Sequence, residues 1–279
     1  MVHSVKQPID IPTLERPLHL LDFFSSSSPY WGLSDLARAC GLDKATCLRS
    51  LRALENHGLV VKEDAQYRLG SRLMTLGYLV QSAYPARRVA LPTMQGLRDT
   101  TGQSVQWVVR EEVEGVYLDV VEATARVRLF IAPGRRAPLY AGASTRLLLA
   151  FAPLDVQKQV FDAPRVQHTP LTPTDALTLK NLLEQTRAWG FAASFGELEP
   201  HSAELAAPVY GAQGGVIAAL SVAGASTLYQ DPTKLEHDLL ALDRAACALS
   251  LQLGFSKPWN SNLQGFLQAI RYTPLEEHV

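Results

Sequence analysis

Apolar residues between positions 33 and 69 repeat with two different periods. They first recur every three or four residues, which predicts two short helices that meet at Gly41. They then alternate with polar residues on both sides of a polar turn at residues 63–65, which predicts a β-hairpin. Two short helices followed by a hairpin are the layout of a winged helix-turn-helix, and we expect this fold for residues 1–70.

The apolar stripe of the second helix indicates which of its faces is exposed. We expect Ser34 and Asp43 to cap the two helices. The buried stripe of the second helix is predicted to consist of Leu48, Leu51 and Leu54. We predict that Thr46 and Arg49 read base edges, because the N-terminal part of such a helix enters the major groove of DNA. The other candidates for DNA contacts are Lys44, Ala45, Ser50, Arg52, Lys62 and Arg68.

Overall charge does not identify the partner of this domain. The chain has 26 Lys and Arg against 27 Asp and Glu, a formal net charge of -1, so a basic field has to come from the placement of charges. A winged helix that binds protein instead of DNA would carry the same pattern of residues. The two alternatives differ in salt dependence, because contacts to several phosphates weaken steeply as salt rises.

The pattern after residue 70 predicts a second domain. With 279 residues, 47% of them hydrophobic, the chain is long enough for two cores. We expect a linker helix over residues 71–85 and the second domain over residues 86–254. Strands are predicted at residues 104–110, 116–121, 126–131, 191–195, 203–210 and 216–223, and helices at residues 87–100, from 144, at 173–188 capped by Thr172, and after Asp231. This order predicts an α+β domain with an antiparallel sheet flanked by helices.

Two segments leave alternatives open. Pro17 lies where a first helix is expected, and proline is tolerated in a first turn, so we expect this helix to start late and to run through Phe24. Residues 255–279 form an extension with an amphipathic stripe that includes Phe266. This stripe either docks on a neighbouring molecule or covers its own domain.

Several sequence blocks occur in a distinctive order: GLSDLARACGLDKATCLRSLRALENHGLV, PGRRAPLYAGASTRLLLAF, GFAASFGELE and ELAAPVYGAQGGVIAALSVAG. Together they resemble the IclR family of bacterial transcriptional regulators over residues 15–254. The resemblance implies a winged helix-turn-helix that binds palindromic operator DNA and a C-terminal GAF-like domain that binds a small metabolite. It further implies a homodimer or tetramer that acts as a repressor or activator.

The resemblance places the effector beside the sequence AGAS at residues 141–144. Small residues allow a ligand to approach the backbone, and the N–H groups that open a helix attract anions, so we expect a carboxylate or aromatic acid. A tight, well-capped helix start without a ligand is the alternative. The candidates for effector contacts are Ala143, Ser144, Thr145, Arg128, Ser194, Glu204, Ser221 and Ala223.

Glu204 departs from the neutral pocket lining that the resemblance implies. Strand alternation places it on the same face as Ala206, so both point into the pocket or neither does. A buried carboxylate needs a partner, and Arg126, Arg128 or the effector are the candidates. A hydroxylated or amine-bearing effector would bind Glu204 directly, whereas an arginine would neutralise it. The alternative is a strand end at which Glu204 lies in water.

The sequence contains no motif that indicates an enzyme. It lacks a Gly-x-Ser-x-Gly elbow, a phosphate-binding glycine loop and a His-Glu-x-x-His helix, so we expect no catalytic residue and no cofactor. Three cysteines without ligand spacing predict no metal site, and Cys47 is expected to be a buried hydrophobe. The longest apolar run, residues 216–225, falls short of the roughly 20 residues of a membrane helix, which favours a cytoplasmic protein without a membrane partner.

Overall fold

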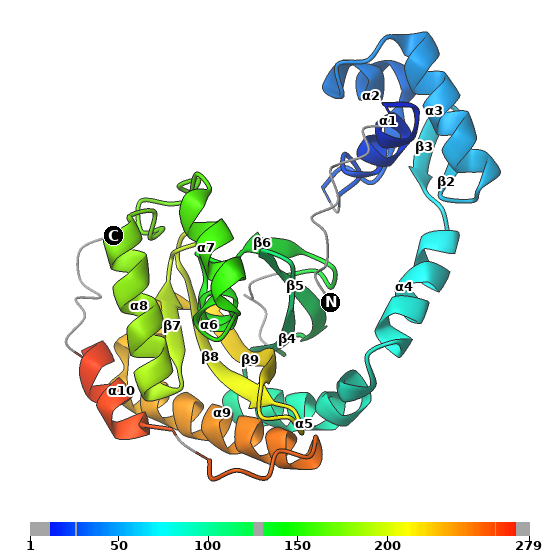
Figure 1. Ribbon diagram of the computed structural model, residues 1–279. Coiled ribbons are helices and arrows are strands. Elements are labelled where there is room, and N and C mark those ends of the chain that lie inside the picture. Colours follow the sequence, from blue (N-terminus) through cyan, green and yellow to red (C-terminus); the bar gives the residue numbers. More distant parts are fainter. Residues whose placement is uncertain (1–11, 26, 125–130, 260, 272–279) are drawn as a thin grey trace. The chain divides into compact units, whose positions relative to one another are not determined.

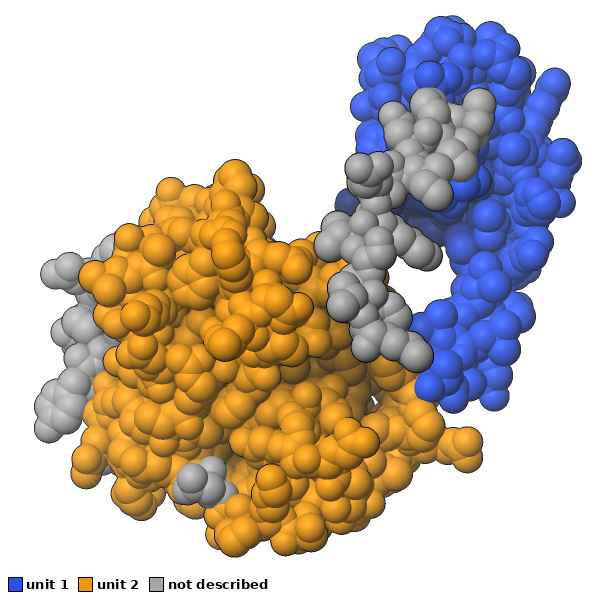
Figure 2. Space-filling view, in the orientation of Figure 1, with its two compact units in different colours: residues 1–83 blue, residues 84–279 orange. Residues whose placement is uncertain are grey.

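The computed structural model describes residues 12–25, 27–124, 131–259 and 261–271. The chain divides into two compact units, Met1–Ala83 and Tyr84–Val279, which Figure 2 colours blue and orange. Each unit has its own hydrophobic core. No helix in the described part of the chain is long and apolar enough to cross a membrane.

Unit 1 is the predicted winged helix-turn-helix (Figure 1). Its strands pair antiparallel in the order β1-β3-β2, and the helices α1, α2 and α3 share one core with this small sheet. The predicted linker helix is α4, which belongs to this unit. The elements are α1 (Pro12–Leu21), β1 (Trp31–Gly32), α2 (Leu33–Ala39), α3 (Lys44–Asn56), β2 (Val60–Glu63), β3 (Gln66–Leu69) and α4 (Arg72–Ser82).

The buried face of α3 is rotated by one position from the predicted stripe. Its buried residues are Cys47, Ser50, Leu51 and Leu54, whereas Leu48 is only half-buried. These four positions follow the i, i+3, i+4, i+7 spacing of one helix face. Burial raises the pKa of the Cys47 thiol to about 11, which agrees with its expected role as a small hydrophobe. Ser50, predicted as a DNA contact, is therefore buried in the unit, and its burial does not favour that role.

Three details of the predicted helix ends and strands also change. Helix α2 begins at Leu33 with Gly32 as its N-cap, so Ser34 is not the cap. Helix α1 ends at Leu21 and contains Pro17 in its interior, so it does not start late or reach Phe24. In the first strand of the hairpin Val60 is buried, whereas the predicted apolar positions are Leu59 and Val61; in the second strand Tyr67 is buried, as its place in the predicted alternation requires.

Unit 2 contains a six-stranded antiparallel sheet in the order β6-β5-β4-β9-β8-β7, as the α+β prediction requires. The strands are β4 (Ser104–Glu111), β5 (Glu114–Val121), β6 (Arg136–Pro138), β7 (Ala192–Phe195), β8 (Ser202–Tyr210) and β9 (Val216–Ala225). The helices are α5 (Pro85–Thr101), α6 (Ala143–Ala150), α7 (Leu154–Asp162), α8 (Ala176–Trp189), η1 (Ser226–Gln230), α9 (Pro232–Gln252) and α10 (Leu263–Arg271). Most of the predicted strand at 126–131 lies outside the described residues.

Helices cover both faces of this sheet (Figure 1). Helices α5 and α9 pack on the face that carries Trp107, Leu205 and Leu220. Helix α6 packs on the opposite face against β8 and β9, and α8 packs against α6. Asp175 caps α8 by accepting a hydrogen bond from the Thr178 amide at 2.7 Å, so the predicted cap at Thr172 is wrong.

The described part of the C-terminal extension packs on its own domain through α10. In α10, Phe266, Leu267 and Ile270 are buried in the core of unit 2. The Phe266 ring stacks on Phe191 at a centroid distance of 5.4 Å and meets the Trp189 ring edge-on. The amphipathic stripe seen in the sequence is therefore part of the domain core.

Replacing Phe266 with alanine should destabilise unit 2 by about 3–5 kcal/mol, because it removes a buried ring and leaves a cavity between α8 and α10. Urea unfolding followed by circular dichroism measures this loss. Leu154→Ala, at an exposed position of α7, is the control and should change stability by less than about 0.5 kcal/mol. Equal effects of the two substitutions would show that α10 does not contribute to the core.

Candidate functional site

The first half of α3 presents the predicted base-reading residues. Lys44, Ala45, Arg49 and Arg52 are exposed, and Thr46 is half-exposed. Asp43 caps the helix as predicted, since its carboxylate accepts a hydrogen bond from the Thr46 amide at 2.9 Å. The Arg49 Nη2 donates to Thr46 Oγ1 at 2.8 Å. The two predicted readers are therefore adjacent and hydrogen-bonded on one exposed face.

The two basic candidates on the hairpin differ in their surroundings. Arg68 Nε donates to the Glu63 carboxylate at 2.7 Å across the hairpin, so much of its charge is balanced within the protein. Lys62 is exposed, and its Nζ lies 5.9 Å from the centre of the Tyr67 ring. Of these two residues, Lys62 is the better placed to meet a phosphate.

The predicted anion site lies at the start of α6. We call the backbone N–H groups of residues 142–144 the cradle. Every residue of α6 is buried, so the free N–H groups of its first turn cannot reach bulk water. Gly142 precedes the helix with a φ of 91°, a conformation that favours glycine. A Cβ at this position would lie 2.8 Å from Leu198 Cδ1 and 3.5 Å from Glu204 Oε2. Glycine is therefore favoured by the turn and by the close approach of Leu198, whereas the distance to Glu204 is that of an ordinary contact.

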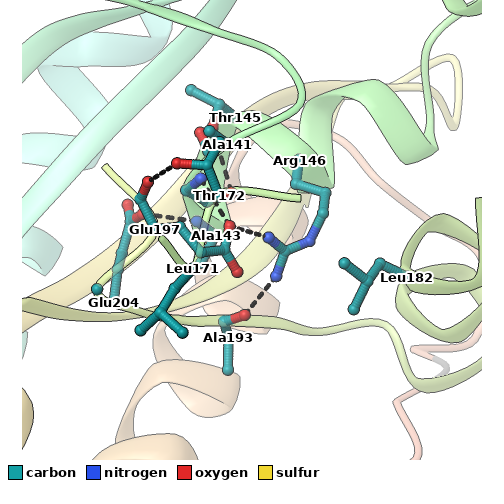
Figure 3. A network of polar contacts seen from close by, with 12 residues as sticks. Ala141, Ala143, Thr145, Arg146, Leu171, Thr172, Leu182, Ala193, Glu197 and Glu204 are labelled. Atoms are coloured by element: carbon teal, nitrogen blue, oxygen red, sulfur yellow. Dashed lines mark hydrogen bonds and ion pairs between the residues drawn. The ribbon is translucent and has the colours of Figure 1, made fainter. Parts of the chain in front are cut away.

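Glu204 occupies this cradle (Figure 3). Its Oε2 accepts hydrogen bonds from the Ala143 amide at 2.8 Å and from the Ser144 amide at 3.2 Å. Glu204 is only 9% exposed, so it does not lie at a strand end in water. The helix start attracts a carboxylate, as predicted, but the carboxylate belongs to the protein. The partners expected from the sequence, Arg126 and Arg128, lie outside the described residues.

A second buried carboxylate supports the same helix start. Glu197 Oε2 accepts a hydrogen bond from the Gly142 amide at 3.0 Å and forms an ion pair with Arg146. Arg146 also donates to the carbonyl of Ala193 on β7 (Figure 3). Burial raises the pKa of Glu197, while the Arg146 guanidinium and the Gly142 amide act in the opposite direction. This network ties α6 to the edge strand of the sheet.

A cavity of about 50 Å³ lies between the cradle and the sheet. Its lining includes Gln106, Tyr117, Gly142, Ser194, Glu204 and Ala223. The strand residues come together because they are cross-strand partners: Ser194 lies opposite Glu204, and Glu204 lies opposite Ala223. Burial and the charge of Glu204 raise the pKa of Tyr117, which keeps the phenol protonated beside the cavity.

The other predicted effector residues in the described part of the chain support the cavity without lining it. Ala143 and Ser144 contribute their amides to Glu204, and Ser221 Oγ donates to Gln106 Oε1 at 3.0 Å. Thr145 Oγ1 is hydrogen-bonded to the carbonyl of Ala141 within the helix start. Arg128 lies outside the described residues.

Sequence reasoning missed two residues of the site. Gln106 interrupts an apolar strand and lies opposite Ser221, so an isolated polar residue in a buried run was an available signal. Glu197 is in the loop after β7, where strand alternation does not indicate which way a side chain points. Among the described residues, no three His, Cys, Asp or Glu side chains gather as metal ligands would.

A larger hollow of about 720 Å³ lies on the other side of the Arg146 and Glu197 pair. It is bounded by α8, α10 and the edge strand β7, and its walls include Trp189, Phe191 and Phe266. Three of the strand residues predicted to contact the effector, Ser194, Glu204 and Ala223, line the small cavity instead. We therefore take the small cavity as the candidate effector site.

Known proteins share both units of this chain. Residues 13–64 match the IclR helix-turn-helix domain, and residues 79–251 match the C-terminal domain of the bacterial transcriptional regulator IclR. The HTH-type transcriptional regulator KipR of Bacillus subtilis is 29% identical over 246 residues, which cover 88% of this chain and 98% of KipR.

Solved structures agree with this assignment. An IclR transcriptional regulator from Alicyclobacillus acidocaldarius has 26% identity and a TM-score of 0.74, and the match covers 88% of this chain and 100% of that one. An IclR homolog from Microbacterium hydrocarbonoxydans, complexed with 4-hydroxybenzoate, has 28% identity and a TM-score of 0.70, and the match covers 86% of this chain and 98% of that one. This chain belongs to the IclR family of bacterial transcriptional regulators.

Proposed function

We propose that this protein is a sequence-specific DNA-binding regulator, a repressor or an activator, whose affinity for its operator is controlled by a small molecule in the cavity beside Glu204. The observation that carries this proposal is the hydrogen-bonded pair of Thr46 and Arg49 on the exposed face of α3. The 4-hydroxybenzoate complex of the Microbacterium relative supports a small-molecule effector. A regulator of this kind meets its operator on the bacterial chromosome, in the cytoplasm.

On DNA, the start of α3 would enter the major groove. Thr46 and Arg49 would contact base edges, and an arginine that meets guanine with two hydrogen bonds is the commonest specific contact. Ala45 lies beside them on the exposed face and would let the helix approach the bases closely. Lys44 and Arg52 would neutralise phosphates at the edges of the groove, and Lys62 would do so from the hairpin.

Effector control requires that the small molecule bind two states of the regulator with different affinity. A coupling of about 1–3 kcal/mol is typical of such systems, which changes operator affinity by roughly 5- to 150-fold. The cavity supports this role because its lining joins strands of the sheet to Gly142, the N-cap of α6, so a ligand there would lie between the sheet and the start of the helix.

Replacing Arg49 with alanine should weaken operator binding by about 1–3 kcal/mol and relax the base preference at one position of each half-site. The operator is first selected from a random duplex library with the wild-type protein, and binding is then measured by fluorescence anisotropy. Arg38→Ala is the matched control, because Arg38 is exposed and pairs with Asp35 on α2. An Arg49→Ala protein that selects the same sequences with the same affinity would contradict the base-reading role.

We further propose that the protein is a homodimer or a dimer of dimers, because a palindromic operator is read by two symmetric copies. Helix α4 supports this proposal. None of its residues is buried within the described part of the chain, and Met74 and Tyr78 are 78% and 69% exposed. Large apolar side chains exposed together on one helix mark a contact surface for a protein.

Replacing both Met74 and Tyr78 with lysine should shift the protein toward the monomer, because these side chains are four residues apart and share one helix face. Size-exclusion chromatography with light scattering measures the mass. Leu154→Lys, at an exposed apolar position of α7, is the control and should keep the wild-type mass. A double variant that keeps that mass as well would exclude this face of α4 from the interface.

A further inference from the structure

The backbone donors of the anion cradle are already used within the protein. Glu204 accepts hydrogen bonds from the Ala143 and Ser144 amides, and Glu197 accepts one from the Gly142 amide. These amides are the groups that would otherwise bind the carboxylate of a ligand. A carboxylate effector would have to displace Glu204 before it could reach them.

The charges around the cavity also disfavour an anion. The charged side chains among its described lining residues are Arg135, Glu199 and Glu204. Arg135 forms an ion pair with Glu199 at 2.6 Å, so these two charges balance. Among the described lining residues the remaining charge is the carboxylate of Glu204, and it would repel a second carboxylate in the same cavity.

Two buried polar atoms in the cavity lining have no hydrogen-bond partner among the described residues. They are Glu204 Oε1 and Gln106 Nε2. Gln106 is completely buried, and its Oε1 accepts a hydrogen bond from Ser221, which leaves the Nε2 group as the donor. Glu204 therefore offers an acceptor and Gln106 offers a donor. Buried groups of this kind are normally paired, and here the missing partners point to a ligand.

We propose that the effector of this protein is a small uncharged molecule with neighbouring hydroxyl groups, and not a carboxylate; the proposal rests on the effector function proposed above. A hydroxyl group both donates and accepts, so a diol satisfies Glu204 Oε1 and Gln106 Nε2 together. An amine would satisfy Glu204 alone. The cavity of about 50 Å³ suits a molecule of a few heavy atoms. This ligand class replaces the carboxylate or aromatic acid expected from the sequence.

Isothermal titration calorimetry on the full-length protein tests the proposal with matched pairs of probes. Propane-1,2-diol is compared with lactate, and glycerol is compared with glycerate, since each acid replaces one hydroxymethyl group with a carboxylate. 4-Hydroxybenzoate is the aromatic acid. We expect each diol to bind the wild-type protein at least about tenfold more tightly than its acid, because the carboxylate meets Glu204 and an occupied cradle.

Substitution of Glu204 should reverse this preference. Glu204→Ala frees the Ala143 and Ser144 amides, so lactate and glycerate should gain about tenfold in affinity while the diols lose a similar factor. Glu204→Gln is the second variant should the alanine protein not fold. Its amide oxygen can still accept from the helix start, and the diols should weaken about tenfold because the charged acceptor is lost. Glu184→Gln, on the exposed side of α8, is the matched control and should bind like wild type.

Two results would overturn the proposal. One is a wild-type protein that binds lactate, glycerate or 4-hydroxybenzoate as tightly as the diols. The other is a protein that binds neither diol, which would mean that water alone meets Glu204 and Gln106. Binding of the selected operator duplex is measured on the same preparations. A wild-type protein that binds no operator duplex would contradict the regulator function. A protein that binds the operator duplex but neither diol would contradict the ligand class alone.

Discussion

The buried N-terminus of α6 is the constraint around which unit 2 is arranged. A helix whose first turn cannot reach water still carries free N–H groups, and each of them needs an acceptor. Glu197 and Glu204 supply these acceptors from the loop after β7 and from β8. The positive end of the helix dipole favours both carboxylates, which makes their burial side by side tolerable. The packing of α6 on the sheet therefore depends on these two side chains.

The two carboxylates have different roles although they share one helix start. Glu197 is paired with Arg146, and losing one member of a buried ion pair typically costs about 3–5 kcal/mol because the other charge is left unpaired. Glu204 lines the cavity and has no arginine partner among the described residues, and its Oε1 has no hydrogen-bond partner there. Glu197 thus stabilises the packing of α6 on the sheet, whereas Glu204 occupies the amides at the start of α6 and determines the polarity of the cavity lining.

Unit 1 applies the same principle at an exposed helix start. Asp43 supplies the acceptor for the first turn of α3, and hydrogen bonds from Thr46 hold the pKa of this carboxyl below its usual value. The cap therefore contributes fully to stability above the usual pKa, and this contribution is lost as the pH falls through the lowered pKa of the folded protein. The side chain and the backbone of Thr46 both contribute to the cap, and Thr46 Oγ1 also accepts a hydrogen bond from Arg49. In unit 1 the carboxylate of Asp43 caps a helix that is exposed for a partner, whereas in unit 2 the carboxylate of Glu204 accepts the hydrogen bonds that a ligand would otherwise accept.

The sequence by itself determined the order of elements, the winged helix-turn-helix and the shared face of Glu204 and Ala206, because these follow from local periodicity. It could not decide the rotation of α3, since Cys47 and Leu48 are both apolar and only packing against α1 and the hairpin selects Cys47. Nor could it show what occupies the cradle. Glu204 lies 61 residues from Ala143 in the chain, and the hydrogen bond between them exists only because α6 packs across β8. Contacts at such separations depend on tertiary packing, which local periodicity does not specify.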